Sequence, residues 1–228
     1  MQEQNHRLMV DSVFYAYQDD LLLQGACIQI NTNECVGLLG RNGSGKTTLL
    51  KIIFGALNTE DKCIQVDNLT YLKPLYQSKN LISYLPQFHF IPRHLRVKDC
   101  FALYDIDFDK IVEVVPEVKF FYQHKIKQLS GGWARMIEVL IVLYSPSLFS
   151  ILDEPFSHLS PIHVELICEL IQSQKSKKGI LLTDHIYKQV LCISDKILVL
   201  SNKQIYPIIN QNDLENYGYS PPQNEQFL

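Results

Sequence analysis

The sequence lacks long apolar runs, paired cysteines and any excess of basic residues. No stretch approaches the roughly 18 apolar residues that a membrane-spanning helix needs, and the start, MQEQNHRLMV, lacks the apolar core of a signal peptide. The six cysteines are scattered, without a C-x-x-C pair or histidines at zinc-finger spacing, so we expect reduced thiols in a cytosol. With 21 basic and 24 acidic residues the net charge is −3, which disfavours nucleic acid as a partner.

The composition is instead that of a folded globular protein. Of the 228 residues, 46% are apolar and 20% are charged, which argues against a disordered, collagenous or coiled-coil chain. This length predicts one large domain or one domain with an inserted lobe.

Strand and helix patterns follow one another in the first third of the chain. Two β-rich runs, at 8–17 and 21–30, predict an antiparallel hairpin. A short apolar strand at 35–39 then leads into a glycine-rich loop and a helix whose apolar positions are Leu49, Leu50, Ile53 and Leu57. Further strands are expected at 63–66 and 81–85.

The middle of the chain differs in composition from the first third. Prolines and dense aromatic residues mark 87–129 as a mainly helical insertion, with a short helix at 97–104. A helix over 133–144 and strands at 148–152 and 179–183 then restore the alternation, which predicts a parallel core sheet. The tail after Ser201 shows no periodic spacing of apolar residues, and we expect surface structure or disorder there.

The loop after the strand at 35–39 matches G-x-x-x-x-G-K-[ST]. Its glycines allow backbone N–H groups to surround phosphate, Lys46 supplies a charge to the β- and γ-phosphates, and the Thr47 hydroxyl can hold Mg²⁺. The N-terminus of the following helix adds its dipole. The residues expected to contact a nucleotide here are Gly40, Arg41, Asn42, Gly43, Ser44, Gly45, Lys46, Thr47 and Thr48.

A pair of carboxylates, Asp153 and Glu154, follows the apolar strand at 148–152. Ligands of open α/β sheets bind at this end of the strands, so we expect Asp153 to hold Mg²⁺ and Glu154 to act on the attacking water. The alternative for this segment alone is an acidic loop with Pro155 as a turn former.

The tetrapeptide LSGG at 129–132 directly precedes the helix over 133–144. Ser130, Gly131 and Gly132 could form a second anion-binding helix terminus, although a serine N-cap with two glycines shaping the turn is the alternative for this segment taken alone.

Together these residues resemble the ATP-binding cassette (ABC) ATPases that power transporters. GRNGSGKTT is similar to their Walker A loop, Gln87 in YLPQ to the Q-loop, LSGG to the signature motif and SILDEP to Walker B. His185 matches the switch histidine, and Tyr17, 23 residues before Gly40, matches the aromatic residue that stacks on adenine. The resemblance extends to about residue 203.

The resemblance implies an α/β fold, with a P-loop NTPase core, an N-terminal antiparallel β-subdomain and an inserted compact helical subdomain. One domain would span 1–228, with the β-lobe and core at about 1–87 and 141–205, the helical lobe at about 88–140 and a tail at about 206–228. Gln87 would contact the metal and assist catalysis, and His185 would contact the γ-phosphate. Taken alone, His185 could be a structural histidine and Tyr17 a strand-face aromatic.

The resemblance further implies ATP and Mg²⁺ as cofactors and a head-to-tail dimer. ATP would lie between the Walker A loop of one copy and Ser130 to Gly132 of a homodimer partner or second cassette. The chain would be a cytoplasmic subunit, peripheral on the cytoplasmic face of the membrane, that hydrolyses ATP to drive transport through separate transmembrane permease subunits. The alternatives are a soluble ABC-type ATPase acting on ribosomes or DNA, and a regulatory module that does not hydrolyse ATP.

Two positions depart from the family pattern. Trp133 replaces the usual glutamine after LSGG, where we expect it to contribute packing, and Ser160 stands where the D-loop, residues 157–160, usually carries aspartate. Ser160 can still cap a helix that begins at Pro161. Pro161, Ile162 and the TDH sequence are similar to those of lipopolysaccharide-export and branched-chain amino-acid-import ATPases. The lysines at 175, 177 and 178 are expected to form a solvated loop.

Overall fold

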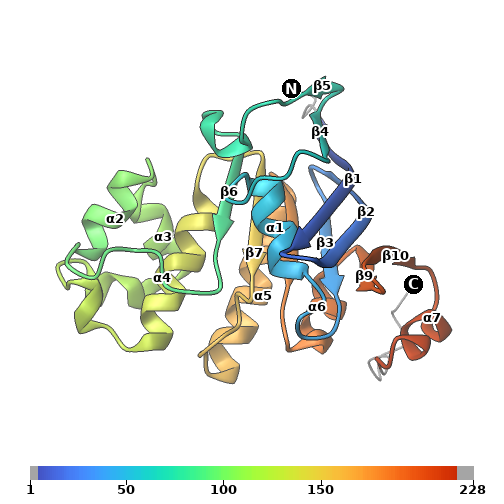
Figure 1. Ribbon diagram of the computed structural model, residues 1–228. Coiled ribbons are helices and arrows are strands. Elements are labelled where there is room, and N and C mark those ends of the chain that lie inside the picture. Colours follow the sequence, from blue (N-terminus) through green and yellow to red (C-terminus); the bar gives the residue numbers. More distant parts are fainter. Residues whose placement is uncertain (1–4, 220–228) are drawn as a thin grey trace.

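A six-stranded, mostly parallel sheet forms the centre of the structure, a computed structural model that describes residues 5–219 (Figure 1). The strand order is β10-β9-β3-β8-β7-β6, and only β10 runs antiparallel to its neighbour. The strands are β3 (Cys35–Leu39), β6 (Ile82–Leu85), β7 (Phe149–Asp153), β8 (Gly179–Thr183), β9 (Lys196–Ser201) and β10 (Gln204–Ile208). The parallel core sheet expected from the alternating pattern is therefore confirmed.

A second, antiparallel sheet is built mainly from the N-terminal part of the chain. Its order is β2-β1-β4-β5, with β1 (Arg7–Tyr17), β2 (Asp20–Asn31), β4 (Cys63–Val66) and β5 (Leu69–Thr70). Leu8 pairs with Ile30, and the register shifts beyond Val10, where Ser12 adopts a positive φ of 54°. The hairpin predicted for 8–30 is confirmed.

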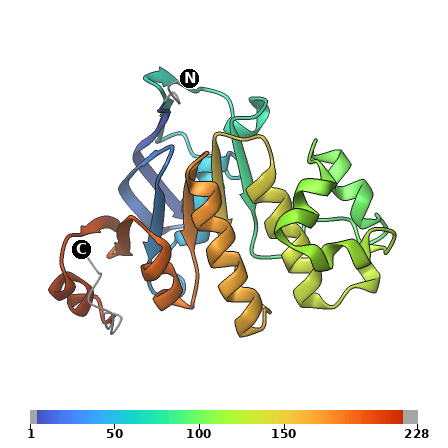
Figure 2. The same cartoon turned by 180° about the vertical axis from the view of Figure 1, so that it is seen from behind.

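Hydrophobic side chains cover both faces of the central sheet, because successive residues of a strand point to opposite sides. Val36 and Leu38 of β3 pack in one core with α1 (Lys46–Phe54) and the antiparallel sheet. Cys35 and Leu39 belong to the opposite core, which contains α4 (Gly131–Tyr144), α5 (Pro161–Lys175) and α6 (Tyr187–Ile193). Figure 2 shows α5 lying along this second face.

A helical lobe lies beside the edge strand β6 in Figure 1. It contains α2 (Val97–Leu103), α3 (Phe108–Val114) and the 3₁₀ turns η2 (Pro116–Phe121) and η3 (Ile126–Gln128); a further 3₁₀ turn, η1 (Leu75–Gln77), precedes β6. Asp107 caps α3 by accepting a hydrogen bond from the Asp109 amide at 3.0 Å. Since α4 begins in this lobe and ends against the central sheet, it joins the two parts.

Two details of the chain differ from expectation. Leu57 lies beyond α1, because Gly55 adopts a left-handed conformation (φ 98°) and ends the helix. The tail is more regular than its sequence suggests: β10 pairs with β9, and α7 (Gln211–Asn216) inserts the buried Leu214 into the core. Residues 220–228 of the expected tail lie outside the described residues.

The prediction of a solvated lysine loop is wrong for Lys178. Its side chain is buried, with 3% exposure, and its ammonium donates to the Ser145 carbonyl at 2.8 Å and to the hydroxyls of Ser147 and Ser150 at 3.3 and 3.2 Å. Burial, with a smaller contribution from the charge of Lys177, lowers the pKa of Lys178 to about 7. The sequence cannot distinguish this lysine from its exposed neighbour, because both follow the polar end of a helix.

Candidate nucleotide site

The glycine-rich loop connects the C-terminal end of β3 to the N-terminus of α1. Gly45 adopts a left-handed φ of 108°, and a Cβ there would lie 3.0 Å from Leu22 Cγ, so the backbone conformation and the space both favour glycine. Lys46 Nζ donates to the carbonyls of Gly40 and Arg41 at 2.7 and 3.2 Å. Burial lowers the pKa of Lys46, while the charges of Glu154 and Asp153 oppose this shift. The loop thus positions the Lys46 ammonium at the N-terminus of α1.

Asp153, at the end of β7, is fully buried beside the loop. Its carboxylate accepts hydrogen bonds from the Thr47 hydroxyl (3.1 Å) and the Tyr84 hydroxyl (3.1 Å). Burial raises the pKa of Asp153, and these two hydrogen bonds lower it in part. Burial and the negative charge of Asp153 also raise the pKa of Tyr84, which keeps its hydroxyl protonated as a donor.

Glu154 is held in an unusual backbone conformation. Its φ is 55°, in the left-handed region that a residue with a side chain seldom adopts. The carboxylate lies 2.7 Å from His185 Nε2 and accepts a hydrogen bond from the Ser157 hydroxyl at 3.2 Å. The side chain of His185 is 53% exposed, whereas that of Glu154 is only 12% exposed, so His185 lies between the carboxylate and solvent.

One pocket of about 400 Å³ brings most of the expected residues together. It is lined by Leu22, Asn42, Gly43, Ser44, Gly45, Lys46, Thr47, Thr48, Gln87, Glu154 and His185. Gly40 and Arg41 lie at the start of the loop and contact Lys46 through their carbonyls. Tyr17 is 66% exposed at the end of β1 and is not part of the lining of this pocket.

The signature segment, residues 129–132, lies outside this pocket at the start of α4. Ser130 is exposed, and its hydroxyl accepts a hydrogen bond from the Trp133 amide at 3.3 Å, as a helix N-cap does. A Cβ placed on Gly131 would meet no atom of the described residues within 4 Å. One chain therefore presents a pocket lined by the glycine-rich loop and, separately, an exposed helix N-terminus.

The two departures from the family pattern have structural explanations. Trp133 packs against Phe121 and His163, with ring centroids 4.7 and 5.1 Å apart. Ser160 is the residue before α5, as expected, but its hydroxyl contacts His163 Nδ1 (3.2 Å) and forms no hydrogen bond with the helix N-terminus.

Sequence reasoning missed several residues that support the site. Asp184 is 7% exposed and accepts the amides of Phe156 and Ile186, both at 2.9 Å, so it fixes the segments after Glu154 and after His185. The sequence offered one indication that Asp184 supports the site, because it directly precedes His185. Tyr84 and Arg135 also contact the site, but neither belongs to a motif that the sequence displays.

The fold and the pocket define a nucleotide-binding domain of the P-loop class. The ABC transporter family profile matches residues 23–157, which is more than half of the chain. An uncharacterized ABC transporter ATP-binding protein of Rhizobium meliloti is 30% identical over 212 residues, covering 87% of this chain and 78% of that protein. The lipopolysaccharide export system ATP-binding protein LptB of Escherichia coli K12 is 32% identical over 200 residues, covering 82% of this chain and 83% of its own length. The chain belongs to the ABC transporter family, and its domain is an ABC nucleotide-binding domain.

Solved structures agree on the fold. An ATP-binding subunit of an ABC transporter superimposes with a TM-score of 0.79 at 20% identity, covering 92% of this chain and 93% of the other. An ATP-binding cassette of another ABC transporter gives a TM-score of 0.76 at 22% identity, with the same two coverages. Both comparisons support the predicted arrangement of a P-loop core with an antiparallel β-subdomain.

Proposed function

We propose that this chain binds Mg²⁺ and ATP, hydrolyses the ATP and thereby drives a transporter whose channel is formed by separate membrane subunits. The observation that carries this proposal is the single pocket that gathers the phosphate loop, Gln87, Glu154 and His185. Transport is favoured over action on ribosomes or DNA by the relatives described above, which are named as transporter ATP-binding proteins.

Four side chains at the pocket have roles in the proposed phosphoryl transfer. Lys46 and the amides of the loop bind the β- and γ-phosphates, and Glu154 accepts a proton from the attacking water. His185, 2.7 Å from Glu154, orients that carboxylate and is close enough to the pocket to contact the γ-phosphate. Gln87 also lines the pocket, where it can contact the metal and the water.

The oxygen atoms of Thr47 and Asp153 fit a magnesium ion. Both are hard donors, they lie 3.1 Å apart, and the second carboxylate oxygen of Asp153 is fixed by Tyr84. Mg²⁺ held there would supply positive charge to the phosphates. It would also favour the ionised form of the buried Asp153 carboxylate, whose pKa burial raises.

The complete site requires a second copy of the chain or a similar cassette. Ser130, Gly131 and Gly132 form an open helix N-terminus, which suits a phosphate, yet they do not line the pocket of their own chain. A head-to-tail dimer places this terminus of one copy over the phosphate loop of the other. Exposed Tyr17 then stacks on the adenine at the edge of the site.

We assign a second, larger groove to a cytoplasmic segment of the membrane subunit. It has a volume of about 610 Å³, and its apolar walls include Tyr76, Pro86, Phe90, Leu103 and Tyr104. Pro86 and Phe90 flank Gln87, so a segment bound here contacts the loop that carries a catalytic side chain. No helix among residues 5–219 is long and apolar enough to cross a bilayer.

The proposed location and domain organisation follow from these assignments. The chain acts on the cytoplasmic face of the membrane, where ATP is available, as a single ATPase domain spanning 1–228. Its β-lobe and core occupy about 1–87 and 141–205, the helical lobe about 88–140 and the tail about 206–228.

Glu154→Gln tests the hydrolytic part of the proposal. The amide keeps the shape of the side chain but cannot accept a proton, so turnover should fall about 10²- to 10⁴-fold while ATP binding persists. The measurement is phosphate release together with binding of a fluorescent ATP analogue. Wild-type protein that releases no phosphate contradicts the proposal, and a variant that turns over at the wild-type rate places the base elsewhere.

Leu103→Arg tests the groove assignment. Leu103 is 68% exposed at the groove, so the substitution is tolerated by the fold but introduces a charge where an apolar segment binds. Co-purification of a permease subunit from detergent-solubilised membranes should be lost, while the isolated variant still hydrolyses ATP. Phe120→Arg, at a position that is 75% exposed and lies outside the groove, is the matched control and should retain the permease. Equal loss in both variants contradicts the assignment.

A further inference from the structure

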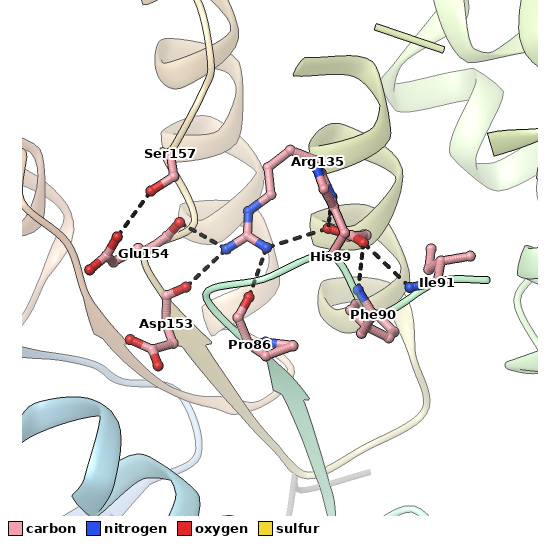
Figure 3. Close-up of polar contacts among 9 residues, drawn as sticks. Pro86, His89, Phe90, Ile91, Arg135, Asp153, Glu154 and Ser157 are labelled. Carbon is pink, nitrogen blue, oxygen red and sulfur yellow. Dashed lines mark hydrogen bonds and ion pairs between the residues drawn. The ribbon is translucent and has the colours of Figure 1, made fainter. Parts of the chain in front are cut away.

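The guanidinium of Arg135 lies buried where three parts of the site meet, with 1% exposure (Figure 3). One nitrogen, Nη2, donates to the carbonyls of Asp153 and Glu154, both at 2.9 Å. The other, Nη1, donates to the Pro86 carbonyl at 2.8 Å. A single side chain of α4 therefore holds the end of β7 and the segment that leads to Gln87.

Glu138, one turn further along α4, completes this network. It is 1% exposed and lies 3.4 Å from Arg135 Nη1, so the two buried charges compensate each other. The same carboxylate accepts the Phe90 amide at 2.9 Å and contacts His89 Nδ1 at 3.0 Å. Arg135 holds the chain just before Gln87, and Glu138 holds it just after.

The network also constrains the backbone conformation of Glu154. A residue with a side chain at φ 55° costs free energy, and such a conformation persists only where the surroundings fix it. Arg135 binds the carbonyl oxygens on both sides of the Glu154 N–Cα–C unit, at Asp153 and at Glu154 itself. This conformation directs the Glu154 carboxylate toward His185, 2.7 Å away. The Arg135 fork therefore stabilises the orientation of the proposed general base.

The position of Arg135 in α4 also connects it to the signature segment. α4 begins at Gly131, so Arg135 is about one turn from the helix N-terminus, roughly 6 Å along the axis. A helix moves as a rigid rod over this distance, because each turn is fixed by its own hydrogen bonds. We expect a displacement of the signature segment to move the guanidinium as well.

We propose that Arg135 is a positioning residue that holds Glu154 and the Gln87 loop in their active arrangement, and that it transmits engagement of Ser130 to Gly132 by a partner copy to the hydrolytic site of its own chain. This inference rests on the proposed ATP hydrolysis and dimer. Lysine cannot replace arginine here, since one ammonium lacks the planar fork that reaches carbonyls on β7 and near Gln87 at the same time.

The test compares Arg135→Lys and Arg135→Met with wild-type protein. For both variants kcat for ATP hydrolysis should fall about ten- to a hundredfold, because misplacement of a catalytic group by about 1 Å has an effect of this size, while KM for ATP changes less than about threefold. Hydrogen–deuterium exchange should become faster at 86–91 and 154–157. In α5, whose residues form no hydrogen bond or ion pair with Arg135, exchange should be unchanged in Arg135→Lys.

Lys178→Met is the matched control, since it also removes a buried cation but one that contacts Ser145, Ser147 and Ser150 instead of the site. Its kcat, measured on folded protein, should remain at the wild-type value. The inference is overturned if Arg135→Lys keeps the wild-type kcat, if Lys178→Met loses as much, or if exchange at 86–91 and 154–157 is unaltered in both Arg135 variants. Wild-type protein without hydrolysis refutes the proposed function instead, and the exchange measurement still decides whether Arg135 holds the two segments.

Discussion

Replacing Lys178 with methionine should change how folding stability depends on pH. The ammonium is buried among Ser145, Ser147 and Ser150, and the like charge of Lys177 also disfavours its protonated form. Burial lowers the pKa of Lys178 from 10.5 to about 7 in the folded protein. The unfolded chain therefore binds a proton at this residue between pH 7 and 10.5, whereas the folded chain does not.

The sign and size of the effect follow from this difference. Below pH 7 the lysine is protonated in both states, and the folded state bears the full cost of a buried charge. Stability then rises with pH through the interval from 7 to 10.5 by about 1.4 kcal/mol per pH unit, or about 5 kcal/mol in all. Methionine has no titrating group, so the free energy of unfolding of the wild type minus that of Lys178→Met should increase by about 2 kcal/mol from pH 7 to 9, because Lys178 is still half protonated in the folded state at pH 7.

Urea unfolding of both proteins at pH 6, 7, 8 and 9, at constant ionic strength, measures this difference directly. The difference should be flat from pH 6 to 7 and rise above it. Lys177→Met provides the matched control, because Lys177 is exposed and its removal should give a difference without this slope. Parallel curves for wild type and Lys178→Met across the whole range would refute the reasoning.

Three further substitutions test other parts of the structure. Lys46→Ala should abolish ATP binding or turnover, measured with a fluorescent ATP analogue and by phosphate release, because it removes the cation that faces the phosphates. Trp133→Gln should retain hydrolysis but lower the melting temperature by several degrees, since the indole packs on Phe121 and His163. Leu152→Ala, at a fully buried position of β7, should reduce the free energy of unfolding by about 2–5 kcal/mol in urea titrations.

Motifs that depend on local spacing could be predicted from the sequence. The glycine loop fixes a strand, a turn and a helix within about 20 residues, so Lys46 and Thr47 could be assigned before the fold was known. Asp153 followed from the apolar strand that precedes it, since the end of a parallel strand is where such a carboxylate meets the loop. The structure places Lys46 and Thr47 in the lining of one pocket, and Asp153 contacts Thr47 directly beside it.

Features that depend on burial of charge could not be predicted. Arg135 and Lys178 are charged residues near helix ends or loops, where a sequence pattern predicts exposure, yet both are buried against backbone carbonyls. The polar partners are remote in sequence, so no periodicity reveals them. The strand β10 was not predicted either, because it contains Pro207. Proline lacks the N–H that a central strand needs and is tolerated here because β10 lies at the edge of the sheet.

The most direct test of the account is to mix Lys46→Ala chains with Ser130→Arg chains. In a head-to-tail dimer each site uses Lys46 of one copy and Ser130 of the other, so each variant alone has two defective sites, whereas a mixed dimer retains one intact site. With random pairing, half of the dimers are mixed, and phosphate release should recover to about a quarter of the wild-type rate if the sites act independently. Ser130→Arg protein that hydrolyses ATP alone at the wild-type rate would contradict the account, because the signature segment would then not belong to the site.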